Sequence, residues 1–366
     1  MENFMKKAFI VKSEQGYKKL NLTKTIQLWE DGLRTTGKRG EYEWWYYDAK
    51  MDDGSTLVIT FFTTNPTNTK GGFNPNIKIE FTRRDGSKVS DLIYVDKKDC
   101  YFNKNKCEVK MKDNFFIGDL NKYYIYVRSP KIEANIELSA NVKSWRPETG
   151  FQQFGEKEYF AWLPSVPEGK TKATIRIDNS IEEFLGTGYH DHNWGNTSML
   201  KLLHHWYWGR AKVGPYTVIS CFLTTVKKYG YTKFPIFMIA NEDKLICDDA
   251  NNINFYTEEK QLSNTTGKWY DNKLVYDYNG VEGHYKITYV VKEIISSFSL
   301  LEDEGKKPQK FKRTLVNIFG LDPTYDRFNG EVIFEKIENN VVVEKHVNNA
   351  TWELMHFRKD KKNKQV

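Results

Sequence analysis

The chain consists largely of short runs of strand-forming residues separated by turn sequences. β-branched and aromatic residues fill runs such as TLVITFFTT (56–64) and YTVISCFLTT (216–225), and these residue types favour strands. Dipeptides typical of hairpin turns, among them Asp53-Gly54 and Asn329-Gly330, stand between the runs. Stretches with the helical period are nearly absent, and only residues 297–304 suggest a short helix. The pattern predicts an all-β fold of antiparallel barrels or sandwiches.

The two halves of the chain contain similar segments in the same order. WWYYDAK (44–50) resembles WYWGRAK (206–212), and the strand-like runs that follow each of them are also alike. Similarity at a fixed spacing of nearly half the chain indicates two related halves. We therefore predict two tandem domains, residues 1–183 and 184–366.

Length and charge restrict the kind of partner. A chain of 366 residues can bury a sizeable core. Its net charge of +7 resides at the ends, because residues 1–24 and 358–366 each carry a net charge of +4. A basic N-terminal extension and a basic C-terminal tail would thus flank a nearly neutral body. This predicts no nucleic-acid partner and at most weak peripheral contact with an anionic membrane.

Cysteine usage and hydropathy suggest a compartment. The four cysteines lack C-x-x-C spacing, the first residues show no secretory signal, and no stretch of about 18 apolar residues occurs. We therefore expect a reduced protein of the cytoplasm.

The segment GTGYHDHNWG (186–195) holds two of the seven histidines, and two more follow at His204 and His205. Alternate residues of an extended strand share a face. Two sets result: Tyr189, Asp191 and Asn193 on one side, and His190, His192 and Trp194 on the other.

The histidines offer a first interpretation, a metal site. His190 and His192 could bind zinc from one face, with His204 as a third ligand and water as the fourth. The H-x-H spacing is weak evidence, however, because histidines in aromatic strands usually hydrogen-bond to their neighbours. We predict no metal site and no cofactor.

Asp191 offers a second interpretation, acid–base chemistry. With 10 Trp, 22 Tyr and 23 Phe, the chain can form an ordinary aromatic β core or line an aromatic cavity. A carboxyl group buried in such a cavity has a raised pKa and can donate a proton to an alkene, while aromatic faces stabilise the cation. The alternative is a structural hydrogen bond or an ion pair, for example with Arg210.

Other common catalytic motifs are missing. The sequence contains no G-x-S-x-G, no P-loop and no G-x-G-x-x-G. The sequence therefore does not support a triad hydrolase, a nucleoside triphosphatase or a dinucleotide-binding enzyme.

Six segments occur in one order across nearly the whole chain: EYEWWYYDA (41–49), FAWLPSVP (160–167), GTGYHDHNWG (186–195), WYWGRA (206–211), TYDRFNG (324–330) and TWELMHFR (351–358). Together they resemble the carotenoid 1,2-hydratase (hydroxyneurosporene synthase), or AttH-like, superfamily. The lipocalin-like fungal Diels–Alderases are its distant relatives. The resemblance implies two tandem lipocalin-like (calycin-type) antiparallel β-barrels. It also implies an apolar isoprenoid- or polyketide-like ligand and no redox cofactor.

The resemblance also implies roles for single residues. In the hydratases an Asp in a Tyr-x-Asp-x-Asn stretch is thought to protonate a terminal alkene, which corresponds here to Asp191 with Tyr189 beside it. A Trp ahead of this stretch corresponds to Trp162. The hydratases carry a His two positions before that Trp, where this chain has Phe160, and this difference casts doubt on carotenoid hydration.

We thus expect an acid-assisted alkene hydratase or cyclase in which Asp191 donates the proton. Tyr189 would orient Asp191, Asn193 would complete the catalytic set, and His192 or His205 would handle the proton of the attacking water. The expected substrate-binding residues are Trp44, Trp45, Tyr46, Trp162, Trp194, His205, Trp206 and Trp208.

Two alternatives stay open. A cofactor-free cyclase or Diels–Alderase-type isomerase would work by shape, with Tyr189, Asn193 or an indole N–H polarising a carbonyl. A lipocalin-like carrier of hydrophobic ligands would need no proton donor. The sequence leaves the substrate and the oligomeric state open.

Overall fold

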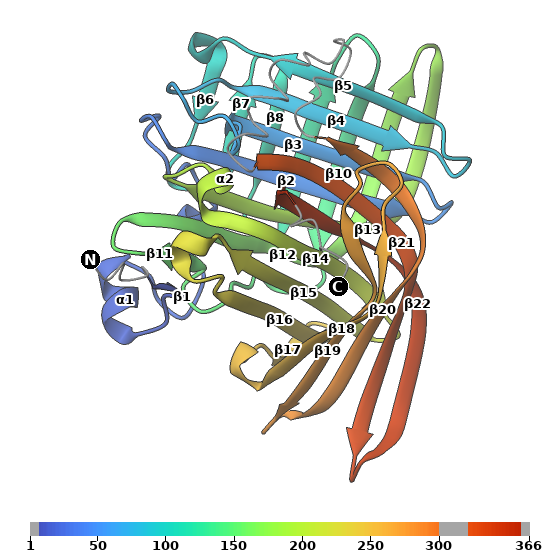
Figure 1. Ribbon diagram of the computed structural model, residues 1–366. Helices are drawn as coiled ribbons and strands as arrows, with labels where there is room; N and C mark the ends of the chain where they lie inside the picture. Colours follow the sequence, from blue (N-terminus) through green and yellow to red (C-terminus); the bar gives the residue numbers. More distant parts are fainter. Residues whose placement is uncertain (1–6, 300–320, 360–366) are drawn as a thin grey trace. The chain divides into compact units, whose positions relative to one another are not determined.

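The computed structural model describes residues 7–299 and 321–359. The chain divides into two compact units, Ala8–Met199 and a second unit that begins at Leu200 (Figure 1). Each unit is an antiparallel sheet.

Thirteen strands among the described residues form the sheet of the first unit. They are β1 (Ala8–Ile10), β2 (Tyr42–Met51), β3 (Thr56–Thr64), β4 (Asn76–Thr82), β5 (Lys88–Tyr94), β6 (Cys100–Phe102), β7 (Glu108–Met111), β8 (Asn114–Gly118), β9 (Lys122–Arg128), β10 (Glu133–Ala140), β11 (Phe151–Phe154), β12 (Glu158–Ile177) and β13 (Ser180–Gly195). Their order in space is β5-β4-β3-β2-β13-β12-β10-β9-β8-β7-β6, and β11 joins β1 to β12.

Nine strands among the described residues form the sheet of the second unit. They are β14 (Leu203–Val213), β15 (Tyr216–Thr225), β16 (Lys233–Asn241), β17 (Lys244–Cys247), β18 (Ile253–Leu262), β19 (Trp269–Gly280), β20 (Gly283–Ser299), β21 (Leu321–Glu338) and β22 (Val341–Arg358). Their order is β17-β16-β15-β14-β22-β21-β20-β19-β18. β14 thus takes the place of β2, and β22 takes the place of β13. The equivalent strands β2 and β14 carry the two similar segments of the sequence.

The boundary between the units falls after β13 and not at the expected join, 183/184. That join lies inside β13, which pairs along its length with β12 and over residues 186–195 with β2. These two ladders tie the whole strand to the first sheet. The motif at 186–195 therefore completes the first unit and does not begin the second.

Helices are few and short in the described part of the chain. They are α1 (Glu14–Lys19), α2 (Met199–Leu202) and the 3-10 helices η1 (Leu28–Asp31), η2 (Lys97–Asp99), η3 (Lys227–Tyr229) and η4 (Ala250–Asn252). Over residues 7–299 and 321–359, no helix has the length and apolar character needed to cross a membrane. The short helix expected at 297–304 is not formed at its first residues, because β20 continues to Ser299. The remainder of that segment lies outside the described residues.

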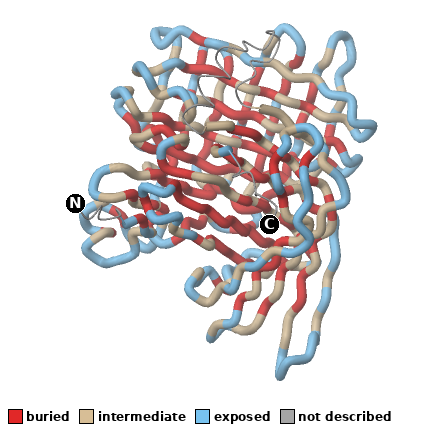
Figure 2. Tube along the Cα trace, viewed as in Figure 1, coloured by how far each residue is buried: buried red, intermediate tan, exposed pale blue. Residues whose placement is uncertain are grey.

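Each unit has a hydrophobic core of its own. Buried positions alternate along many strands (Figure 2), as in β9, where Tyr123, Ile125 and Val127 are buried. These side chains belong to the core of the first unit, and Trp352 and Phe328 belong to that of the second. The alternation follows from the two-residue period of a strand.

Candidate functional site

Asp191 lies in β13 with Tyr189 and Asn193 on the same face, as expected for alternate residues. Its Oδ2 accepts hydrogen bonds from Tyr189 Oη at 2.8 Å and Trp162 Nε1 at 2.7 Å. Its Oδ1 accepts one from Asn193 Nδ2 at 2.6 Å. A carboxylate offers about four lone-pair positions. Among the described residues, 7–299 and 321–359, two donors bond to Oδ2 and one bonds to Oδ1. One lone-pair position on Oδ1 is therefore left for a proton.

Burial makes Asp191 a weaker acid than an ordinary aspartic acid. Only 6% of this residue is exposed, and desolvation raises its pKa from 3.8 to about 6, against the opposing effect of the hydrogen bonds. Desolvation also raises the pKa of the Tyr189 hydroxyl well above its ordinary value, so Tyr189 remains a donor. A carboxyl group that is half protonated near pH 6 can give and take back a proton under mild conditions.

Prolines in β12 explain the irregular backbone beside Asp191. Pro164 and Pro167 have no N–H to donate to the ladder, and the pairing of β12 with β13 shifts register twice over residues 163–169. Asp191 lies opposite this bulged stretch. Trp162, just before this stretch, pairs regularly with Asn193. Its indole therefore lies on the same face of the sheet as the Asp191 carboxyl group.

Aromatic side chains lie beside Asp191 on its face of the sheet. Tyr46 pairs with Asp191, and Trp44 pairs with Asn193. Trp44 stacks on Phe160 with ring centroids 6.2 Å apart. Trp44 and Tyr46 are only half-buried, so this aromatic face is partly open to solvent. Phe160, stacked on Trp44, adds a further apolar ring to this face.

The other face of β13 points into the protein core. His192 Nε2 lies 2.7 Å from Glu43 Oε1, and the His192 ring stacks on Trp45 with a centroid distance of 4.7 Å. Trp194 lies at the same centroid distance from His192. His192, Trp45 and Trp194 were grouped with Asp191 from the sequence. The structure does not bring them to Asp191, because they project from the opposite side of the sheet.

His190 takes part in a buried polar network. Its Nδ1 donates to the Tyr46 carbonyl at 2.8 Å, and its Nε2 lies 3.2 Å from Asp31 Oδ2, which also accepts from Tyr123 Oη at 2.5 Å. Burial by itself raises the pKa of Asp31, but attraction to His190 and the hydrogen bonds outweigh it, and the pKa is lowered. These contacts give His190 a structural role. Both of its ring nitrogens, which the metal interpretation would use as ligands, are in hydrogen bonds.

In the second unit, β14 presents its predicted site residues to two faces. Trp206 Nε1 donates to Glu353 Oε1 at 3.1 Å, and Trp208 pairs with Glu353. His205 projects to the opposite face and pairs with His356 of β22. The structure therefore groups Trp206 and Trp208 around Glu353 and separates them from His205.

Several polar residues of the first unit escaped prediction. Asp31 and Glu43 are buried, and Glu43 accepts from the backbone N–H groups of Arg34 at 2.7 Å and Thr35 at 2.8 Å. One signal was present in the sequence: Glu43 interrupts the aromatic run 42–47, and a buried charge requires partners. The sequence around Asp31 gave no comparable signal, because Asp31 lies in the short helix η1 and not in an aromatic strand.

Fold and site together define a class, an all-β protein of two tandem lipocalin-like units with a buried carboxyl group in an aromatic face. The chain belongs to the Diels-Alderase-like family, which it matches over residues 31–296. This range contains Trp162 and the 186–195 motif, and it confirms the resemblance drawn from the sequence segments.

One curated relative is hydroxyneurosporene dehydrogenase of Chlorobaculum tepidum, which is 24% identical over 214 residues. The match covers 47% of this chain and 54% of that protein. The chain thus spans about half of that relative.

Two solved structures share the fold. CghA with Sch210972 superposes with a TM-score of 0.63 at 12% identity, over 90% of this chain and 96% of CghA. Kievitone hydratase of Nectria haematococca superposes with a TM-score of 0.55 at 14% identity, over 97% of this chain and 98% of that enzyme. At these identities the likeness concerns the fold alone, and it confirms the lipocalin-like prediction.

Proposed function

We propose that this protein is a cofactor-free enzyme that binds an apolar isoprenoid- or polyketide-like molecule against the aromatic face of the first sheet. Asp191 donates a proton to an alkene of that molecule. The supporting observation is the buried carboxyl group itself, which has a pKa of about 6 and lies beside half-buried aromatic rings. Membership of a Diels-Alderase-like family and the fold shared with a hydratase agree with this chemistry.

The proton to be donated resides on Oδ1 of Asp191, because Tyr189 and Trp162 both donate to Oδ2. Its transfer forms a C–H bond at one alkene carbon and leaves a tertiary cation at the other. Aromatic faces stabilise this cation, and the three donors stabilise the carboxylate that remains. Water or an internal alkene then attacks the cation. The proton released in that step returns to Asp191, so the net reaction is hydration or cyclisation without a redox change.

A Diels–Alderase-type cyclase is the second candidate, supported by the family match. The Tyr189 hydroxyl, the Trp162 indole and one Asn193 N–H already donate to Asp191. The O–H of protonated Asp191 is therefore the group placed to polarise a substrate carbonyl. In this candidate Asp191 donates a hydrogen bond and keeps its proton.

The test begins with the substrate. The full chain is incubated with a cell lipid extract, and bound and newly formed compounds are identified by mass spectrometry. A product heavier by one water supports hydration, and an isomer of unchanged mass supports cyclisation. A bound compound without conversion would contradict an enzyme and favour a carrier.

Asp191→Asn then separates proton transfer from hydrogen bonding. Asn keeps the shape and can donate a hydrogen bond but cannot donate a proton, so we expect turnover to fall by about 10³-fold for hydration. A measurable fall of only about threefold to tenfold would indicate the hydrogen-bonding candidate. Glu182→Gln is the matched control, because Glu182 lies in the same strand in a surface ion pair with Arg83. Full turnover in Asp191→Asn would refute both mechanisms.

A further inference from the structure

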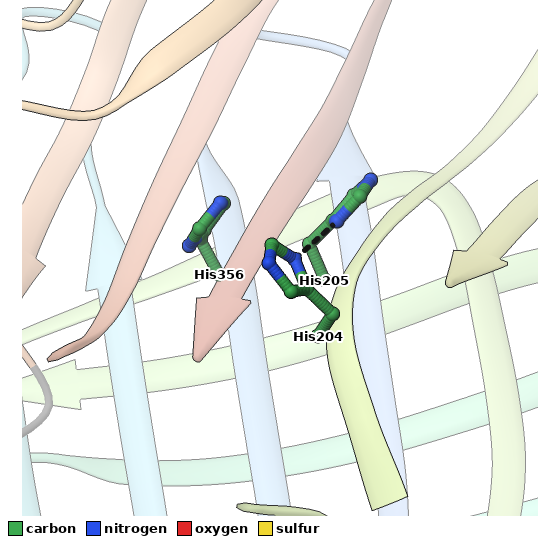
Figure 3. A group of neighbouring side chains, drawn as sticks. All are labelled: His204, His205 and His356. Carbon is green, nitrogen blue, oxygen red and sulfur yellow. Dashed lines mark hydrogen bonds between the residues drawn. The ribbon is translucent and has the colours of Figure 1, made fainter. Parts of the chain in front are cut away.

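Three histidines meet in the second unit. His204 and His205 come from β14, and His356 comes from β22 (Figure 3). One ring nitrogen of each lies within 4.8 Å of those of the other two. His356 is buried, while His204 and His205 are half-buried, so an ion can reach the group from solvent.

The backbone explains how two consecutive residues contribute to one cluster. Neighbours in a regular strand point to opposite faces. The pairing of β14 with β15 shifts register between Leu203 and His205, and this irregularity brings the His204 ring to the side of His205. His356 arrives on the same side because it pairs directly with His205 across the ladder. A β-bulge of this kind often redirects a side chain next to a functional site.

The rings of His204 and His205 point nitrogen atoms toward each other. Nδ1 of His204 lies 2.8 Å from Nδ1 of His205. Thr224 Oγ1 lies 3.3 Å from Nε2 of His205, so the proton of this ring can reside on Nε2 and leave the Nδ1 lone pair toward His204. A hydrogen bond from the second ring nitrogen is the usual support of a metal-bound histidine.

A buried carboxyl group, Asp326, lies near the histidines. Asp326 interacts electrostatically with His356, and it lies two positions along β21 from Thr324, the residue paired with His356. Ser297 Oγ donates to Asp326 Oδ1 at 2.5 Å. When ionised, a carboxyl group this close to the histidines favours a bound cation.

We propose that His204, His205 and His356 bind a divalent transition-metal ion, with Zn²⁺ as the expected ion. Three imidazole nitrogens with a fourth position for water form a known zinc arrangement. Tetrahedral Zn–N bonds of about 2.0–2.1 Å separate ligand nitrogens by about 3.3 Å. The 2.8 Å between His204 and His205 must therefore widen slightly, and His356, within 4.8 Å of both, must adopt the same spacing. This site was not predicted from the sequence, and it is independent of the function proposed for Asp191.

A second group of metal-ligand type, Asp31, Cys107 and His190, is less suited to an ion. All three residues are buried, whereas two of the three histidines are half-buried. Asp31 Oδ2 already accepts from Tyr123, and Cys107 Sγ contacts the Phe116 carbonyl at 3.8 Å.

The first experiment measures binding to the full chain, purified without a polyhistidine tag and treated with a chelator. Zn²⁺ is titrated calorimetrically, and Co²⁺ is added as a spectroscopic probe. We expect one equivalent of Zn²⁺ and visible Co²⁺ bands of a four-coordinate site. X-ray absorption of the Zn²⁺-loaded protein should show three imidazole ligands. Absence of stoichiometric binding, or fewer than three imidazoles, would overturn the proposal.

Variants then assign the site. His204→Gln changes a half-buried ring, and we expect it to weaken Zn²⁺ binding by more than about 100-fold. His346→Gln is the control, because His346 is a half-buried histidine of the same unit that bonds to Glu344 at 2.7 Å. Equal losses in the two variants would overturn the assignment. Should His204→Gln fail to fold by circular dichroism, the imidazole count in the unmodified protein decides.

Discussion

At the residue scale, adjacent positions of β13 have different roles. Asp191 faces half-buried aromatic rings and carries a raised pKa. Its neighbour His192 faces the core and bonds to Glu43. The alternation of a strand separates the two chemistries although the residues are consecutive. The Asp191 face is therefore where chemistry is expected, and the His192 face contributes to stability.

The pKa of Asp191 predicts a specific dependence of stability on pH. The folded state keeps this proton up to about pH 6, whereas the unfolded chain loses it near 3.8. The stabilisation is therefore complete below pH 3.8 and is lost as the pH rises to about 6, by up to about 3 kcal/mol. Urea denaturation at several pH values should show this fall in the unmodified protein relative to Asp191→Asn. Parallel curves for the two proteins would contradict the raised pKa.

Glu43 provides a prediction about stability without catalysis. Its two oxygens accept from His192, from the backbone of Arg34 and from the backbone and hydroxyl of Thr35. Glu43→Gln replaces one acceptor oxygen by a donor that faces other donors. We expect a loss of about 2–3 kcal/mol in the free energy of unfolding, measured by urea denaturation. Glu41→Gln is the control.

Glu41 suits this comparison because it makes similar bonds at the surface, to Thr36 and the Lys38 backbone. Water can replace those bonds, so Glu41→Gln should cost less than about 1 kcal/mol. Equal losses at the two positions would show that burial of Glu43 is not decisive.

At the element scale, β13 organises the first unit because it pairs with β2 on one side and β12 on the other. Close approach of backbones near its middle requires glycine. A Cβ atom at Gly186 would lie 2.3 Å from the Lys50 carbonyl oxygen and 2.7 Å from Met51 Cα. These β2 backbone atoms cannot move without disturbing the β2–β13 ladder.

Gly186→Ala should therefore destabilise the protein by about 1–3 kcal/mol, measured as a lower midpoint of thermal unfolding. Gly71→Ala is the matched control, because a Cβ atom there meets nothing within 4 Å. An unchanged midpoint in Gly186→Ala would mean that β2 and β13 are not so closely paired.

At the scale of the whole molecule, two units with equivalent strand order have separate cores. Trp352 is 2% exposed in the second core and packs against Tyr289 and Phe328, with ring centroids 5.2 Å and 5.9 Å away. Damage to this core is expected to remain within its own unit.

Trp352→Ala should cost about 3–5 kcal/mol in the second unit. Hydrogen exchange should show lost protection in β14 and β19–β22, while β2, β12 and β13 keep theirs. Trp269→Ala, at a residue that is 42% exposed, serves as the control and should change little. Equal loss of protection in both units would show that they unfold together.

Local sequence determined the strands and the division of β13 into two faces. The run 56–64 is β3 and the run 216–225 is β15, because side-chain alternation and turn dipeptides act over a few residues. The grouping of Tyr189, Asp191 and Asn193 follows from the same period, and the repeated segments at 44–50 and 206–212 anticipated equivalent strands in two sheets.

Tertiary structure alone decided which distant residues meet. The position of the unit boundary depends on the pairing of β13 with β2 and β12, and the histidine cluster depends on a register shift in β14 and on the pairing of His205 with His356. Register between strands far apart in the chain follows from the packing of whole faces, which no short segment encodes. The pKa of Asp191 is likewise set by burial, which exists only after the sheet has formed.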